Sequence, residues 1–191
     1  VDVSEGAAAD KNKKITVESL FKGIPSSVGI GTASPTTLLE VKDTSSSASI
    51  CVTSPNTGES TLNLGDVDDI NIQRIISDHS NNSLQIHTNN SERLRIDSSG
   101  RVLIGTTTEG EGSADNLTIA DSGNCGITIR SGTTNAGAIY FSDATSGAGE
   151  YDGYIEYRHG SNYMQFNTNQ GERMRIDSSG NVGIGTGGGA D

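Results

Sequence analysis

The stretch ERLRIDSSGRVLIGT, from Glu92 to Thr106, predicts a β-hairpin. Leu94 and Ile96 alternate with arginines, and this period of two turns one face of a strand inward and the other toward water. DSSG supplies Asp at the first and Gly at the fourth position of a type I turn, where glycine accepts the left-handed conformation that reverses the chain. Val102 and Ile104 continue the apolar face, so the turn joins two strands.

The same phrase returns near the end of the chain as ERMRIDSSGNVGIGT, from Glu172 to Thr186. NSLQIHTNN precedes the first copy and NYMQFNTNQ the second, which predicts a further strand and turn in each case and so a three-stranded meander. The motif VGIGT or its variant begins at Val28, Val102 and Val182. Internal repeats of this length indicate a tandem architecture. We therefore expect an N-terminal lead-in or attachment segment (1–27), β repeat modules (28–101 and 102–181), and the start of a third repeat with a Gly-rich end (182–191).

Other short strands are expected in both modules. They are LLEV, SICVTS (Ser49–Ser54) and TLNLGD in the first module, and GITIRS (Gly126–Ser131) and AIYFSD in the second. The helix candidate TVESLFKGI, from Thr16 to Ile24, fits a short helix and a strand equally well. The expected fold class is therefore all-β, an elongated fibre of two tandem β-meander or hairpin modules.

The composition predicts a thin core within one chain. Hydrophobic residues make up 31% of the 191 residues, against roughly 45–50% in ordinary globular chains. Burial of this little apolar surface looks insufficient to offset the conformational entropy lost on folding, which costs about 1–2 kcal/mol per residue. We expect association with identical chains to supply the missing burial.

Charge and cysteine content restrict the partners. The net charge of −11 argues against a nucleic-acid partner, because binding phosphates needs a basic surface. No apolar run approaches the roughly 18 residues of a membrane span, so membrane insertion is not expected. Cys51 and Cys125 are too few for a disulfide framework or a Cys-rich metal site, and buried free thiols are the simplest interpretation.

The hairpin phrase, the segments in front of it and VGIGTASP resemble bacteriophage tail-fibre proteins, especially those of marine cyanophages. The resemblance is strong over Val28–Pro35, Ser83–Thr106 and Asn162–Thr186. It implies a structural protein of the virion surface that forms a β-rich homotrimer, intertwined or packed side by side, and contributes to host attachment. The resemblance does not extend to residues 1–27, which we expect to attach the fibre to other virion proteins. Three alternatives stay open: a capsid-decorating knob or fibre without a receptor role, a polysaccharide depolymerase, and a non-viral extracellular filament subunit.

Catalytic, cofactor-binding and metal-ligating residues are not expected. Glu150, Asp152 and Glu156 could supply the paired carboxylates of glycoside hydrolysis. However, the even spacing of Asp152 and Glu156 puts both on one strand face, where exposed acids are usually only solvated. In GDVDD, the carboxylates of Asp66, Asp68 and Asp69 could suit Ca²⁺, but the full ligand run of an EF-hand loop is lacking, so a solvated turn is the better interpretation. His79 and His159 occupy equivalent positions, which favours a packing or surface role for both.

All five tyrosines fall in the second module, and the aligned residues of the first module are not aromatic. The shared scaffold therefore does not require these rings. Aromatic faces with a polar hydroxyl suit sugar stacking and protein contacts; the alternative is that the rings only fill a thicker core of the second module. The candidate recognition surface, for a cell-surface glycan or another virion protein, consists of Tyr151, Asp152, Tyr154, Glu156, Tyr157 and Tyr163.

Overall fold

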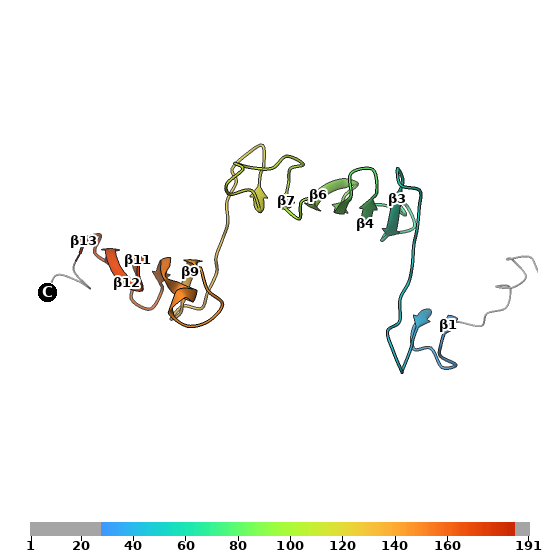
Figure 1. Cartoon of the computed structure of the whole chain (residues 1–191), viewed down its shortest axis with the longest axis horizontal. Helices are drawn as coiled ribbons and strands as arrows, with labels where there is room; N and C mark the ends of the chain where they lie inside the picture. Colours follow the sequence, from blue (N-terminus) through green and yellow to red (C-terminus); the bar gives the residue numbers. More distant parts are fainter. Residues whose placement is uncertain (1–27, 186–191) are drawn as a thin grey trace, which may run out of the picture. The chain divides into compact units, whose positions relative to one another are not determined.

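The computed structural model describes residues 28–185 and is all-β, as predicted (Figure 1). The chain divides into two compact units between Thr118 and Ile119. The lead-in with its helix candidate (16–24) and the Gly-rich end (186–191) lie outside the described residues. Within residues 28–185, no helix has the length and apolar character needed to cross a membrane.

A small parallel sheet opens the described chain. It joins β1 (Val28–Ile30) to β2 (Leu39–Val41), with Val28 opposite Leu39. Gly31 follows β1 with φ at +78°, and a Cβ there would lie 2.0 Å from the carbonyl oxygen of Lys42. The first VGIGT motif therefore needs this glycine for a positive φ and for a close approach of two backbone segments.

The first large sheet has six strands in the order β3-β4-β5-β6-β7-β8. Neighbouring strands from β3 to β7 pair antiparallel, and the predicted hairpin is confirmed as β6 and β7. Its turn is closed by the Gly100 amide, which donates to the Asp97 carbonyl at 2.9 Å. The strands are β3 (Glu59–Asn63), β4 (Gln73–Asp78), β5 (Ser83–Thr88), β6 (Ser91–Ile96), β7 (Val102–Ile104) and β8 (Leu117–Ile119).

The second large sheet has five strands in the order β13-β12-β11-β10-β9. Its residue pairs between β10 and β13 match those between β4 and β7 with residue numbers 80 higher, and a bulge interrupts both sheets at the same point. The second and third VGIGT-type strands, β7 and β13, each pair with the strand before them; β13 is the edge strand of its sheet, whereas β8 lies beyond β7. The elements are β9 (Ala136–Phe141), the 3₁₀ turn η1 (Ala148–Tyr151), β10 (Gly153–Arg158), β11 (Tyr163–Thr168), β12 (Gly171–Ile176) and β13 (Val182–Ile184).

Each large sheet has an apolar face that is only partly covered in one chain. The registers align five apolar side chains in a row across each sheet. At the sheet edges, Leu62 is 57% and Ile139 50% exposed. Among the described residues, only Ile76 and Leu103 are buried apolar side chains, and both lie on the opposite, mainly polar face of the first sheet. The rows are Leu62-Ile75-Ile86-Leu94-Ile104 and Ile139-Ile155-Phe166-Met174-Ile184.

Two of the predicted strands are wrong. SICVTS and GITIRS carry the expected alternation of side chains, yet neither pairs with another strand in the described part of the chain. A strand needs a backbone partner as well as a side-chain pattern. Cys51 lies within the first of these segments and Cys125 directly before the second. Both thiols are free, but they are exposed, so the expectation that they are buried is wrong.

The aspartates of the two DSSG turns, Asp97 and Asp177, have lowered pKa values, so the fold should lose stability in acid. Asp177 accepts bonds from the side-chain and backbone nitrogens of Asn181, each at 2.9 Å, and from the Ser179 amide at 2.8 Å. These bonds, led by that of the Asn181 side chain, lower the pKa of Asp177 below 3.8. Because the folded pKa is depressed, the carboxylate stabilises the fold above the unfolded pKa, and this stabilisation is lost as the pH falls through the folded value.

Asp177→Ala should therefore lower the melting temperature at neutral pH, and its difference from wild type should narrow once the pH is below 3.8. Thermal melts followed by circular dichroism, at neutral pH and at a pH below 3.8, measure the difference in melting temperature between the variant and wild type. Ser178→Ala, in the same turn, is the control and should melt like wild type. An equal penalty for Asp177→Ala at both pH values would contradict a role for the ionised carboxylate.

Candidate recognition surface

One face of the second sheet gathers three of its tyrosines and most of its charged side chains. Side chains alternate along β10, so Tyr154, Glu156 and Arg158 share a face. The strand register places Tyr140 of β9 opposite Tyr154 and residues of β11 opposite all three. We call this surface the tyrosine face; it consists of Tyr140, Tyr154, Glu156, Arg158, Tyr163, Gln165, Asn167 and Arg175.

The aromatic rings of the tyrosine face are held by contacts with one another and with an arginine. The ring centroids of Tyr140 and Tyr154 are 5.1 Å apart, and Tyr140 is 53% exposed. The guanidinium of Arg175 lies 4.0 Å from the centroid of the Tyr163 ring. Glu172 accepts hydrogen bonds from the same guanidinium and fixes its position. The result is a partly exposed pair of rings beside a cation–π pair.

The centre of the tyrosine face is a buried carboxylate. Glu156 is only 4% exposed, which corrects the expectation of a solvated acidic face. It accepts hydrogen bonds from Arg158 Nε and, at 3.1 Å, from Gln165 Nε2. Such partners offset the cost of removing a carboxylate from water. Burial raises the pKa of Tyr154, and the charge of Glu156 raises it further, so this hydroxyl stays protonated and able to donate.

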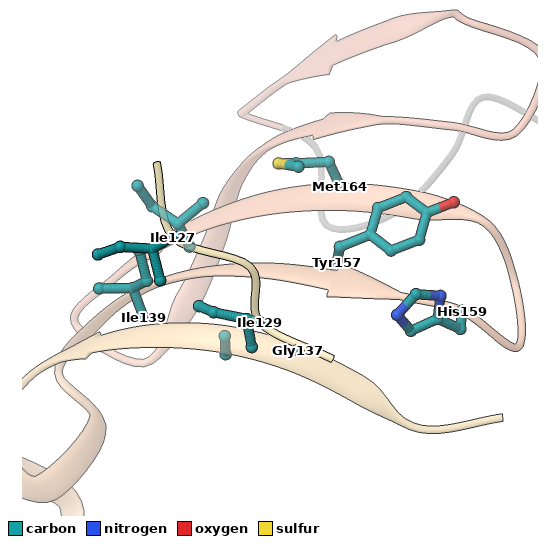
Figure 2. A pocket seen from close by; sticks show the side chains of 9 residues that line it. Ile127, Ile129, Gly137, Ile139, Tyr157, His159 and Met164 are labelled. Atoms are coloured by element: carbon teal, nitrogen blue, oxygen red, sulfur yellow. The ribbon is translucent and has the colours of Figure 1, made fainter. Parts of the chain in front are cut away.

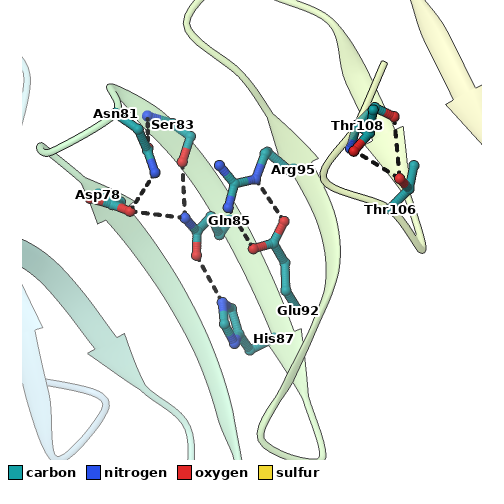
Figure 3. Close-up of polar contacts among 9 residues, drawn as sticks. All are labelled: Asp78, Asn81, Ser83, Gln85, His87, Glu92, Arg95, Thr106 and Thr108. Atoms are coloured by element: carbon teal, nitrogen blue, oxygen red, sulfur yellow. Dashed lines mark hydrogen bonds and ion pairs between the residues drawn. The ribbon is translucent and has the colours of Figure 1, made fainter. Parts of the chain in front are cut away.

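The corresponding face of the first sheet is built differently (Figure 3). There a chain of hydrogen bonds runs from Arg74 Nη2 to His87 Nδ1 at 3.2 Å, and from His87 Nε2 to Gln85 Oε1 at 2.9 Å. Gln85 Nε2 then donates to Ser83 Oγ at 2.9 Å and to Asp78 Oδ2 at 3.3 Å. The described face of the first sheet carries no tyrosine, so the aromatic rings are specific to the second sheet.

Two parts of this scaffold are nevertheless shared. Arg95 donates to Glu92 at 2.7 Å in the first sheet, and Arg175 donates to Glu172 in the second. Gln85 and Gln165 are buried at equivalent positions. The residues shared by the two sheets therefore support the common scaffold, and the residues that differ between the sheets give the tyrosine face its chemistry.

The structure divides the six residues singled out from the sequence. Tyr154, Glu156 and Tyr163 lie on the tyrosine face. Tyr157 lies on the opposite, apolar face, where its ring meets His159 edge-on at 4.9 Å and lines a hollow (Figure 2). Tyr151 is exposed at the end of η1. Asp152 precedes β10 and accepts a bond from Gln170 Nε2 at 2.9 Å.

Sequence reasoning missed Tyr140, Arg158 and Arg175. Tyr140 was outside the candidate set because it lies far from the cluster GEYDGYIEY in sequence. Only the register, which puts Tyr140 opposite Tyr154, brings it into the site. The arginines carried a weaker signal, since each follows an acidic residue by two or three positions.

The other chemical candidates have structural partners of their own. Asp66 Oδ1 accepts from the amides of Asp68 at 3.0 Å and Asp69 at 2.9 Å, so GDVDD is a turn closed by its own hydrogen bonds. His79 contacts Ser60 Oγ through Nε2 at 3.1 Å. Between residues 28 and 185, no group of three or more histidines, cysteines and acids is placed to hold a metal ion.

The tyrosine face offers two modes of contact to a ligand. Its rings can stack on a flat apolar surface such as one face of a sugar, while the hydroxyls and guanidinium groups around them can donate hydrogen bonds to polar groups.

Neither protein-family models nor curated protein sequences match this chain.

Proposed function

We propose that this chain is the subunit of a homotrimeric virion fibre of the phage tail-fibre type, which projects from the particle and contributes to host-surface recognition. In this proposal, residues 1–27 attach the fibre to other virion proteins, and the tyrosine face contacts a glycan of the bacterial surface. The fibre works by assembly and adhesion and has no catalytic role. One observation carries the proposal: each large sheet has a row of five apolar side chains that a single chain covers only in part, with both ends of each row exposed.

The exposed rows favour association of identical chains. Ile75 and Ile86, in the middle of the first sheet, are each 39% exposed. Contiguous apolar surface of this kind marks an interaction site in a soluble protein. Because both sheets carry the same row, a copy of the chain offers a matching surface at both places. The number three comes from the resemblance of the hairpin phrase to trimeric tail fibres.

The matching registers of the two sheets support a shaft that lengthens by duplication. Residue pairs recur 80 positions apart, from Gln73–Thr88 in the first sheet to Gly153–Thr168 in the second. Modules that each present the same association surface can be added in tandem without a new interface. This supports two tandem modules in an elongated fibre.

Tyr154 and Tyr157 allow a matched test of the recognition role, because both are half-buried tyrosines of β10 but lie on opposite faces. Tyr154→Ser should weaken adsorption of the purified fibre to host cells about tenfold, which corresponds to ~1.4 kcal/mol. Tyr157→Ser should leave adsorption close to wild type. Fluorescently labelled protein and sedimented cells give the binding curve.

Circular dichroism and solution mass serve as controls that both variants keep the fold and assembly of the wild type. Unchanged adsorption of a folded Tyr154→Ser fibre would reject the tyrosine face as the recognition surface. A greater loss for Tyr157→Ser than for Tyr154→Ser would move the contact to the apolar face.

A further inference from the structure

Two segments have the form of β-strands but no strand partner. Residues 47–55 and 124–132 each run for nine residues without a turn or a bend. Each then enters the same kind of turn, in which the Gly58 amide donates to the Pro55 carbonyl at 2.8 Å and the Asn135 amide to the Gly132 carbonyl at 2.9 Å. The first strand of a large sheet, β3 or β9, follows directly.

The side chains of both segments are typical of strands that pack on one face. Ile50 and Val52 alternate with Cys51 and Thr53, as Ile127 and Ile129 do with Thr128 and Arg130. Ile50 is 71% and Ile127 68% exposed. Within the described part of the chain, no backbone hydrogen bond reaches residues 47–54 or 124–131. The backbone groups of both segments thus lack hydrogen-bond partners in one chain, and Ile50 and Ile127 are largely exposed.

The second segment lies over the apolar face of its own sheet and leaves space there. Ile127 and Ile129 border a hollow of about 250 Å³ whose other walls include Ile139, Tyr157 and Met164 (Figure 2). A Cβ at Gly137 would lie 3.2 Å from Ile129 Cγ2, so the segment approaches β9 closely without pairing with it. The Ser131 hydroxyl, at the end of the segment, is buried with no hydrogen-bond partner.

We propose that residues 47–55 and 124–132 are interchain β-strands, whose backbone partners are strands of a second copy of this chain. This inference rests on the homo-oligomer of the proposed function and names where its chains hydrogen-bond. An extended segment with free backbone groups and alternating apolar side chains is a template for pairing with another strand.

A second copy fits these segments better than a foreign peptide for two reasons. The feature occurs twice, each time just before the first strand of a large sheet, so one partner of the same repeat length satisfies both places. The segments are also nearly uncharged in a chain of net charge −11: residues 47–55 contain no charged side chain, and residues 124–132 contain only Arg130. Copies of the chain can therefore approach here without the repulsion that like charges create across strands.

Hydrogen exchange of the whole chain, read by mass spectrometry, tests the inference alongside the solution mass from light scattering. In the assembled protein, amides of residues 47–54 and 124–131 should exchange at least about tenfold more slowly than those of the exposed loop 144–147, and at rates similar to β4 and β5. The loop is an internal reference in every sample.

The outcomes separate this inference from the proposed function. An oligomer whose two segments exchange as fast as the loop would overturn the interchain strands and leave the fibre standing. A folded monomer of 19.8 kDa would overturn both.

A pair of variants adds a sharper comparison. Ile127→Asp places a charge on the apolar side of the segment and should abolish the slow exchange of residues 124–131. Thr128→Asp adds the same charge on the other side of the segment, and residues 124–131 should then keep their slow exchange. Equal protection in both variants would contradict the strand orientation inferred here, and the wild-type exchange pattern decides the proposal even if Ile127→Asp does not fold.

Discussion

In the proposed homotrimer, Ile86→Asp is expected to separate the chains, so that the mass in solution falls from near three times 19.8 kDa to that of a single chain. Ile86 is the central residue of the row that runs from Leu62 to Ile104, with Ile75 and Leu94 beside it. In one chain its side chain is 39% exposed, so the new carboxylate stays hydrated there. In an assembly that covers the row, the carboxylate would lose its water and find no cation.

The expected effect is large because the charge enters every copy. An uncompensated buried charge costs several kcal/mol, and each 1.4 kcal/mol changes an association constant about tenfold. Light scattering over a range of protein concentrations gives the mass. Circular dichroism checks that the separated chain keeps its strands, because the substitution leaves the backbone pairing of β5 intact.

Val67→Asp is the matched control for this change. Val67 is 98% exposed in the loop between β3 and β4, so the same loss of an apolar side chain and gain of a charge occur away from the apolar row. This variant should keep the mass of the wild type. If Ile86→Asp also kept that mass, the exposed row would not be the surface that joins the chains.

The parts of the fold that sequence predicted correctly depend on neighbours in the chain. The hairpin of β6 and β7 follows from side-chain alternation and from the Asp and Gly of DSSG, all within fifteen residues. SICVTS shows where this reasoning stops: its alternation is local, but a strand also needs a partner, and one chain supplies none among the described residues. In the hairpin the partner strand is a neighbour in the sequence, whereas SICVTS would need a partner strand that sequence alternation cannot identify.

The site was predicted less completely because its residues meet through strand register. Tyr140 joins Tyr154 only once β9 is known to pair with β10. The burial of Glu156 did have a sequence signal, since the aligned residue 80 positions earlier is the buried Ile76. The odd spacing of Tyr154 and Tyr157 likewise implied opposite faces once a strand was assumed.

Leu103→Ala is expected to destabilise the first unit by about 2–5 kcal/mol, the usual cost of removing a buried leucine side chain. Leu103 is 1% exposed and lies opposite Arg95 on the same face as Ile76, the other buried apolar residue described. With only two such side chains in the described chain, the loss of one removes a large share of the burial in the first sheet. Urea unfolding at a fixed protein concentration measures the change.

Leu38→Ala makes the same chemical change at a residue that is 79% exposed and should have little effect. The second unit provides an internal comparison, because the position equivalent to Leu103 is Gly183 and the position equivalent to Ile76 is Glu156. There the face is held by the bonds from Arg158 and Gln165 to Glu156 rather than by apolar burial.

Leu103→Ala should therefore shift the unfolding of the first unit and leave that of the second close to wild type, a separation that calorimetry or segment-resolved hydrogen exchange can detect. A single transition that moves as a whole would show that the units unfold together. Equal stabilities of Leu103→Ala and Leu38→Ala would show that burial on this face does not hold the first sheet. The expected separation would mean that apolar anchors stabilise one sheet, while the other has exchanged them for the polar groups that support its tyrosine face.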